Sequence, residues 1–155
     1  SNDYKDGSLE QLLIYDPSAN LIIIARYCSY HLLNVIPLLI ISPIIGIIIG
    51  LDFIEIMAII LCLMIGSLII SAINLFTASI TINNKSSLIF IIALPFTIPI
   101  IILAVLACNY FIVEQQTEYY WNYIELLIYL ALIMIPIFLL AACSSLKQGI
   151  NLSNS

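Results

Sequence analysis

His31 is the residue best suited to chemistry inside the long apolar stretches, and it is the only histidine among 155 residues. An ionisable side chain in a membrane-spanning stretch is a functional candidate by default. Asn34, three positions further on, would lie on almost the same face of a helix and is its expected partner. The structural alternative is a neutral His31 that donates a hydrogen bond to a neighbouring helix.

The four cysteines, Cys28, Cys62, Cys108 and Cys143, form no C-x-x-C pattern, and each lies in or beside an apolar stretch. We interpret them as buried, unreactive thiols without a metal site or disulfide framework. The sequence contains no phosphate-binding loop pattern. It also has no carboxylate pair at helical spacing inside an apolar stretch, and one histidine gives little basis for a catalytic triad. We therefore expect no enzymatic activity and no directly bound cofactor.

A short amphipathic segment precedes the first apolar stretch. Ser8 and Gln11 have the spacing of a capping box, which predicts a helix over about 8–15. Three leucines at i, i+3 and i+4 form one apolar face, and Pro17 ends the helix. This helix could lie on the lipid surface or dock onto a soluble partner. The candidate docking residues are Ser8, Leu9, Glu10, Gln11, Leu12 and Leu13.

Composition places the chain among membrane proteins. Only 8% of residues are charged, against about 25% in soluble domains. Four continuous apolar runs are each long enough to cross the bilayer once as a helix. We predict an all-α, multi-pass fold with a polar segment at 1–19 and a membrane domain at 20–155, whose spans cover about 20–50, 55–82, 86–112 and 122–146. Because the chain starts at Ser1 in a polar segment, we expect further sequence before it.

The basic residues predict an orientation in the membrane. If the four helices alternate, all four basic residues fall on one side, which the positive-inside rule assigns to the cytoplasm or the mitochondrial matrix. These residues are Lys5, Arg26, Lys85 and Lys147. The acidic residues between the spans fall on the other side and are Asp52, Glu55, Glu114 and Glu118. No basic patch indicates nucleic acid.

Prolines interrupt two of the predicted spans. Pro37 and Pro43 lie in the first, and Pro95 and Pro99 lie in the third. Each proline removes a backbone hydrogen bond and should bend its helix. Such a break could act as a hinge beside a path through the membrane, or it could be a fixed bend.

Small and polar residues mark places where helices could meet. Gly46 and Gly50 form a G-x-x-x-G pattern that allows close helix approach. The second span carries a stripe that we interpret as a packing surface, with a polar-lined translocation path as the alternative. The stripe comprises Ser67, Ser71, Asn74, Ala78 and Thr81. A cluster at the start of the fourth span is typical of an aromatic belt at the membrane interface. It comprises Tyr119, Tyr120, Trp121 and Tyr123.

Three stretches carry a family resemblance. They are Asp-Gly-Ser-Leu-Glu-Gln-Leu at 6–12, Pro-Leu-Leu-Ile-Ile-Ser-Pro at 37–43 followed by Gly-Leu-Asp at 50–52, and Leu-Pro-Phe-Thr-Ile-Pro at 94–99. In this order they resemble the CcmB family, the membrane subunit of the ABC transporter for cytochrome c maturation. The likeness covers nearly the whole chain and includes the closing Leu146-Lys147. It departs at 83–87, where the family usually has two basic residues and glycines, and the family has two further spans before residue 6.

The resemblance implies a six-helix permease half in the bacterial or mitochondrial inner membrane. It implies a separate ABC ATPase subunit that binds ATP, a haem-handling membrane subunit, and a coupling helix at 8–15. It is compatible with a homodimer. Haem would be handled by the complex, whose ATP hydrolysis would free a haem-loaded chaperone. Haem contact becomes a further hypothesis for His31, although Trp121 is the only tryptophan and no Trp-rich haem motif is present.

Two other functions fit the same sequence pattern. One is an ABC permease for another cargo, such as a lipid or polysaccharide. The other is a membrane scaffold that does not transport.

Overall fold

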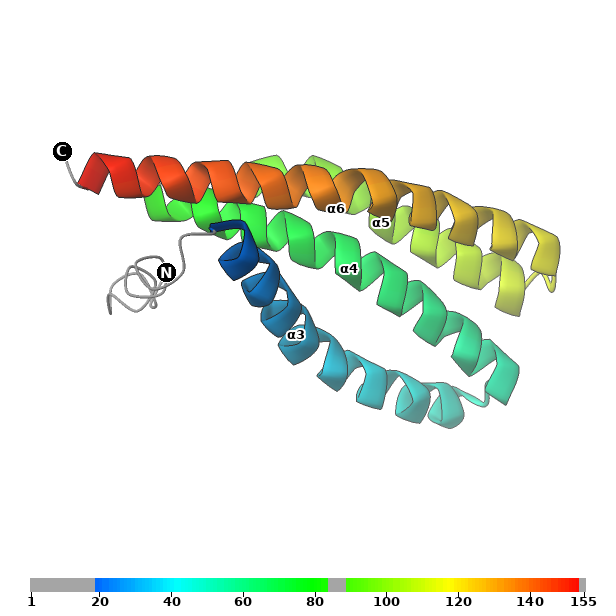
Figure 1. Ribbon diagram of the computed structural model, residues 1–155. Helices are drawn as coiled ribbons and strands as arrows, with labels where there is room; N and C mark the ends of the chain where they lie inside the picture. Colours follow the sequence, from blue (N-terminus) through cyan, green and yellow to red (C-terminus); the bar gives the residue numbers. More distant parts are fainter. Residues whose placement is uncertain (1–18, 84–88, 154–155) are drawn as a thin grey trace.

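The computed structural model describes residues 19–83 and 89–153, which form four long helices (Figure 1). These are α3 (Ala19–Ile49), α4 (Phe53–Asn83), α5 (Ile89–Ile112) and α6 (Thr117–Ser153). Each is long and apolar enough to cross a membrane, so the predicted all-helical, multi-pass fold is confirmed. The predicted helix at 8–15 lies outside the described residues. Helix α6 begins at Thr117 rather than near 122, because a helix can continue into the polar sequence that flanks its apolar part.

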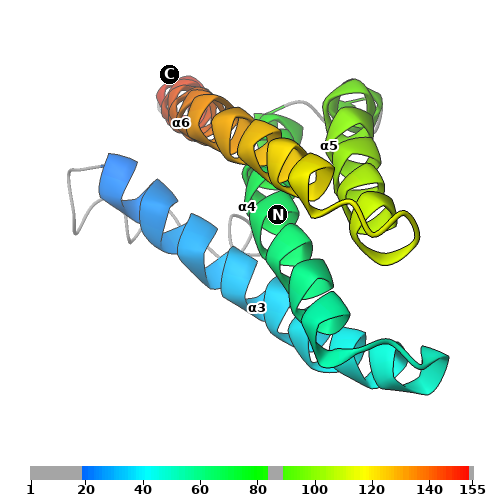
Figure 2. The same ribbon diagram turned by 90° about the vertical axis from the view of Figure 1, so that its right-hand side faces the viewer.

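Helix α4 is the centre of the bundle and packs against the other three helices (Figures 1 and 2). Its residues Ile69, Ala72 and Ile73 are fully buried, as are Leu127 and Ala142 of α6. Small side chains on both helices let their backbones approach closely, which is how membrane helices gain packing energy in lipid. The central helix is therefore the frame on which α3, α5 and α6 are positioned.

The outward faces of the bundle are strongly apolar. On α3, Leu33 and Ile48 are 75% and 78% exposed, and α5 and α6 also carry many exposed large apolar side chains. Lipid tails solvate such surfaces without the penalty that water would impose. The exposure pattern is therefore that of a chain in a bilayer.

A cluster of three phenylalanines joins α4, α5 and α6. The ring centroid of Phe138 lies 5.4 Å from that of Phe76 and 5.5 Å from that of Phe96. Their tilted and edge-to-face arrangements are those that aromatic quadrupoles favour. This cluster fixes the spacing of the three helices towards the end of the bundle that holds the chain's C-terminus.

The turn between α3 and α4 is set by Gly50, which has a positive φ of 87°. The backbone N–H of Leu51 donates to the carbonyl of Gly46 at 3.0 Å, and that of Gly50 donates to Ile47 at 3.1 Å. This pair of bonds is a Schellman motif, which ends a helix on a left-handed residue. Of the G-x-x-x-G pair, Gly50 therefore ends the helix, and Gly46 alone serves close packing.

Helix α4 starts immediately afterwards in a capping arrangement. The carboxylate of Glu55 accepts a hydrogen bond from the Asp52 backbone N–H at 2.9 Å. The Asp52 carbonyl accepts from the Ile56 N–H at 3.0 Å. A glutamate at the third helical position that reaches back in this way is half of a capping box. The Gly50-Leu51-Asp52 stretch thus ends one helix and begins the next.

The end of the bundle with the turns at 50–52 and 113–116 is called the outer end below. The described acidic residues of these turns and of the helix ends beside them are Asp52, Glu55, Glu114 and Glu118. Arg26 lies in the first third of α3 and Lys147 in the last two turns of α6, so both are towards the opposite end of the bundle. Lys5 and Lys85 lie outside the described residues. The charge separation supports the predicted orientation, which remains a prediction.

Candidate functional site: a groove between three helices

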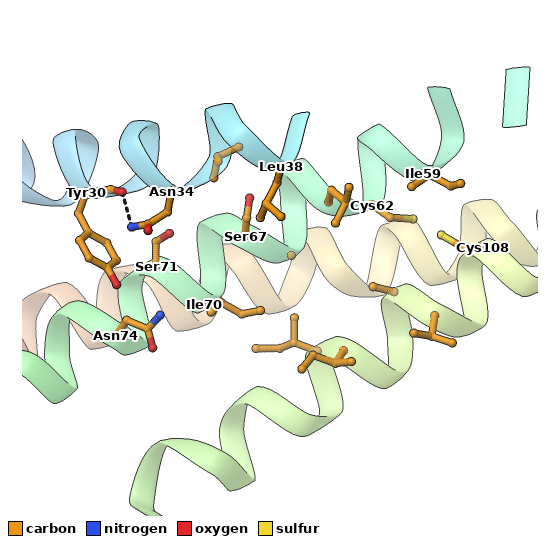
Figure 3. Close-up of a pocket in the computed structure, with 17 residues that line it drawn as sticks. Tyr30, Asn34, Leu38, Ile59, Cys62, Ser67, Ile70, Ser71, Asn74 and Cys108 are labelled. Atoms are coloured by element: carbon orange, nitrogen blue, oxygen red, sulfur yellow. Dashed lines mark hydrogen bonds between the residues drawn. The ribbon is translucent and has the colours of Figure 1, made fainter. Parts of the chain in front are cut away.

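An open groove of about 550 Å³ lies between α3, α4 and α5 (Figure 3). Its walls are predominantly apolar, and it is large enough for a substantial hydrophobic group. Each of the three helices contributes apolar side chains to the lining. They are Val35 and Leu38 of α3; Ile59, Leu63 and Ile70 of α4; and Ile100, Ile101, Ala104 and Val105 of α5. The groove exists because α3 is held to α4 near both ends and is less closely packed between them.

The contact near the start of α3 consists of two polar bonds. The Tyr27 hydroxyl donates to the Leu68 backbone carbonyl at 2.7 Å. One turn further, the Nδ1 atom of His31 lies 3.1 Å from the Ser71 hydroxyl oxygen. The rings of Tyr27 and His31 stack with their centroids 6.1 Å apart. Polar groups that bond across helices inside a bilayer hold those helices together, because lipid offers no partner.

His31 shares a hydrogen bond with the neighbouring helix α4, as the structural alternative requires, and its haem contact stays a hypothesis. It is not among the residues that line the groove. The predicted His31–Asn34 partnership is wrong, because the Asn34 amide donates to the carbonyl of Tyr30 in its own helix at 2.8 Å (Figure 3). Helical spacing put the two side chains on nearly one face but could not show that the backbone would satisfy Asn34.

The contact at the outer end of α3 depends on Gly46. A Cβ atom at this position would lie 2.8 Å from Cγ1 of Ile56 in α4. Real Cβ atoms do not approach that closely, so only glycine permits the helices to meet here. The polar contacts of Tyr27 and His31 thus hold α3 to α4 near its start, and the Gly46 contact holds it near its end.

The polar stripe of α4 serves the groove more than helix packing. Ser71 is buried against α3, which agrees with the packing interpretation. Ser67 and Asn74 line the groove, and Asn74 is exposed there (Figure 3). Ala78 is exposed as well, so the interpretation of the whole stripe as a packing surface is wrong.

The four prolines singled out from the sequence lie inside continuous helices. Pro37 and Pro43 are in α3, and Pro95 and Pro99 are in α5. None of them lines the groove, although Leu38 and Ile100 beside them do. A proline leaves the carbonyl four residues earlier without its helical partner and so weakens the helix locally. Whether they act as hinges remains a prediction.

The aromatic cluster at the start of α6 divides into two groups. Tyr119 and Trp121 are 50% and 56% exposed, as an interfacial belt requires. Tyr110 of α5 stacks between Tyr119 and Tyr123, with centroid distances of 5.2 and 5.5 Å. Tyr120 is only 2% exposed, so its assignment to the belt is wrong and it belongs to the core. Adjacent helical positions point about 100° apart, which explains the division.

The cysteines differ in their surroundings. Cys62 and Cys143 are buried, Cys108 is half-buried and Cys28 is exposed. The prediction of burial is therefore wrong for Cys28. Cys62 of α4 and Cys108 of α5 both line the groove, and their side chains point towards each other at one end of it (Figure 3). No sequence motif signals this pair, because the two residues come from different helices.

Sequence reasoning also missed the α5 wall of the groove. Helix α5 is apolar on every side, so nothing in its pattern separates groove-facing from lipid-facing positions. Among residues 19–83 and 89–153, no group of three or more His, Cys, Asp or Glu side chains could hold a metal ion. The predicted docking residues, Ser8 to Leu13, lie outside the described residues.

Comparison with known proteins places this arrangement in a family. The family model described as CcmB protein matches residues 1–149. A protein named Heme exporter protein B from Bradyrhizobium diazoefficiens is 26% identical over 151 residues, covering 96% of this chain and 67% of the relative. Proteins of the same name from Haemophilus influenzae and Pseudomonas aeruginosa are 29% and 28% identical over 66% of this chain. Those two matches cover 48% and 47% of the relatives, so the aligned part spans about half of their length. The matched region includes the segment before α3 and the four helices except for the last four residues of α6, and the chain belongs to the CcmB family.

Proposed function

We propose that this chain is the permease subunit of an ABC transporter for cytochrome c-type biogenesis, in a bacterial or mitochondrial inner membrane. The observation that carries the proposal is the family match over residues 1–149, with relatives named Heme exporter protein B. In this role a separate ATPase subunit supplies the energy and a haem-handling membrane subunit works beside this chain. The four-helix bundle transmits motion from the ATPase through the membrane.

The predicted coupling helix at 8–15 is the contact to the ATPase in this proposal. Its leucine face would fill an apolar groove of the partner, in the manner of an amphipathic helix. The first experiment is co-purification of the ATPase with Leu12→Asp. We expect loss of the ATPase while the protein still inserts in the membrane. Leu12→Met keeps volume and polarity and is the matched control. Normal capture by Leu12→Asp would contradict the docking role.

The groove between α3, α4 and α5 is the described feature best suited to a hydrophobic cargo. Its apolar walls and the few polar groups on α3 and α4 have the character of a ligand site. Ala104→Trp should fill it, whereas Leu132→Trp places the same side chain at a position of α6 that is 67% exposed. We expect holocytochrome c to fall in the Ala104 variant alone, with ATPase capture unchanged. Equal holocytochrome c in both variants would exclude the groove from the function.

The cargo is tested by deleting the gene. We expect holocytochrome c to disappear while apocytochrome c is still made, and complementation to restore it. Unchanged holocytochrome c would contradict the proposed pathway and favour another cargo. A variant that restores holocytochrome c without capturing the ATPase would indicate a scaffold.

A further inference from the structure

Cys62 and Cys108 are neighbouring thiols on the wall of the groove that the proposed function does not use. Cys62 is on α4 and Cys108 is on α5, and their side chains point towards each other (Figure 3). Both residues line the groove. Cys62 is 2% exposed, whereas Cys108 is half-buried. A small molecule that enters the groove would therefore meet Cys108 first, with Cys62 directly behind it.

The helices around the pair are packed closely enough to hold the two sulfurs in place. One turn from Cys62, Gly66 faces Ile100 of α5, where an added Cβ would lie 3.9 Å from the Ile100 side chain. Tyr120 of α6 bonds to the Ala58 carbonyl one turn from Cys62 on the other side. Two cysteines can be joined without backbone movement only if their helices already place them together. The packing of α4, α5 and α6 keeps the two residues as neighbours on adjacent helices.

The position along the helices is also favourable. Cys108 lies four residues before the end of α5 at Ile112, which is about 6 Å at 1.5 Å per residue. Cys62 lies nine residues after the start of α4 at Phe53, or about 14 Å. Both therefore belong to the half of the bundle nearest the outer end. On the predicted orientation this half faces the compartment in which disulfides persist.

We propose that Cys62 and Cys108 are a redox-active thiol pair that forms a reversible disulfide between α4 and α5. The oxidant is a small disulfide that enters through the groove. Cys108 attacks one of its sulfurs, forming a mixed disulfide and releasing one thiol. Cys62 then displaces the second thiol, leaving the Cys62–Cys108 disulfide. The two protons of the cysteines leave on the two released thiols, so atoms and electrons balance, and an added thiol reverses the exchange.

The disulfide would fix the distance between α4 and α5 along one edge of the groove. Reduction would leave α5 held there by packing alone. The redox state of the pair would thereby control how far the groove can open. This consequence depends on the geometry of the groove and not on the identity of its cargo.

The test uses membranes that contain the full chain, treated with 4,4′-dipyridyl disulfide, a small lipid-soluble oxidant. Cys28 and Cys143 offer matched controls, because they lie on α3 and α6, away from the pair. In the Cys28→Ser/Cys143→Ser variant we expect mass spectrometry without reductant to find the peptides of residues 62 and 108 joined. Dithiothreitol should release them. Adding Cys62→Ala or Cys108→Ala should abolish the product and leave a mixed disulfide on the remaining cysteine.

The result that would overturn the proposal is modification of Cys62 and Cys108 as separate mixed disulfides, without the joined product. Failure of either residue to react in the folded membrane protein would overturn it as well. ATPase capture is measured in the same membranes. A joined product without ATPase capture would leave the thiol pair standing and count against the proposed coupling function.

Discussion

The hydroxyl of Tyr120, at the start of α6, donates a hydrogen bond to the backbone carbonyl of Ala58 in α4 at 3.0 Å. The two residues are 62 positions apart, and the tyrosine ring is almost completely buried. The ring of Phe111 in α5 packs against it with centroids 4.8 Å apart. One side chain thus joins three helices at the outer end, beside the Cys62–Cys108 pair.

Removal of the Tyr120 hydroxyl should destabilise the bundle slightly. We expect Tyr120→Phe to lower the free energy of unfolding by about 0.6 kcal/mol, which is typical for one hydrogen bond between membrane helices. Tyr119→Phe removes the hydroxyl of an exposed neighbour and should change little. Unfolding of the two purified variants in mixed detergent micelles measures both changes in the free energy of unfolding. Equal effects would show that the Ala58 contact adds no stability.

A methyl group at Gly46 should separate α3 from α4. Because the new Cβ would lie 2.8 Å from Cγ1 of Ile56, we expect Gly46→Ala to cost about 1–3 kcal/mol. Gly66→Ala is the matched control, since its nearest contact is 3.9 Å away. Combining Gly46→Ala with Ile56→Ala should cost less than the sum of the single changes. Strict additivity would contradict the proposed clash.

The left-handed residue between α5 and α6 is Gln115, with a φ of 53°. The N–H of Gln116 donates to the Tyr110 carbonyl at 2.9 Å, one residue further back than in a Schellman motif, and this bond closes the turn. Glycine adopts this conformation without steric cost, so Gln115→Gly should stabilise the turn by up to about 1 kcal/mol. Gln115→Val should destabilise it. Thermal unfolding of both variants in detergent tests this expectation. A Gln115→Val variant more stable than Gln115→Gly would contradict the left-handed conformation of Gln115.

His31 and Ser71 should be energetically coupled. In a double-mutant cycle with His31→Ala and Ser71→Ala, we expect a coupling energy of about 0.6 kcal/mol. Asn34→Ala paired with Ser71→Ala should show none, because Asn34 bonds within its own helix. We also expect His31→Ala to lower cytochrome c assembly modestly and leave the haem content of the purified complex unchanged. Loss of haem absorbance would contradict the packing role.

Much of the fold was predictable because a bilayer imposes strict limits on sequence. Helices that cross hydrocarbon need long apolar stretches, so the number of described spans and the helical class followed from composition. The signals at 50–52 were also local: Gly50 adopts a left-handed conformation, and Asp52 with Glu55 begins a helix. Such features depend on a few neighbouring residues.

The sequence alone determined that the chain is a helical membrane protein of this family, and it pointed to a hydrogen bond from His31 to another helix. Only the tertiary structure decided that Ser71 is the partner of His31, that Tyr120 is a core residue and that Cys62 meets Cys108. The physical reason is that these helices are apolar on nearly all sides. In lipid, the hydrophobic pattern does not distinguish a face that packs from one that is solvated, so pairing is decided by steric fit and by a few polar contacts.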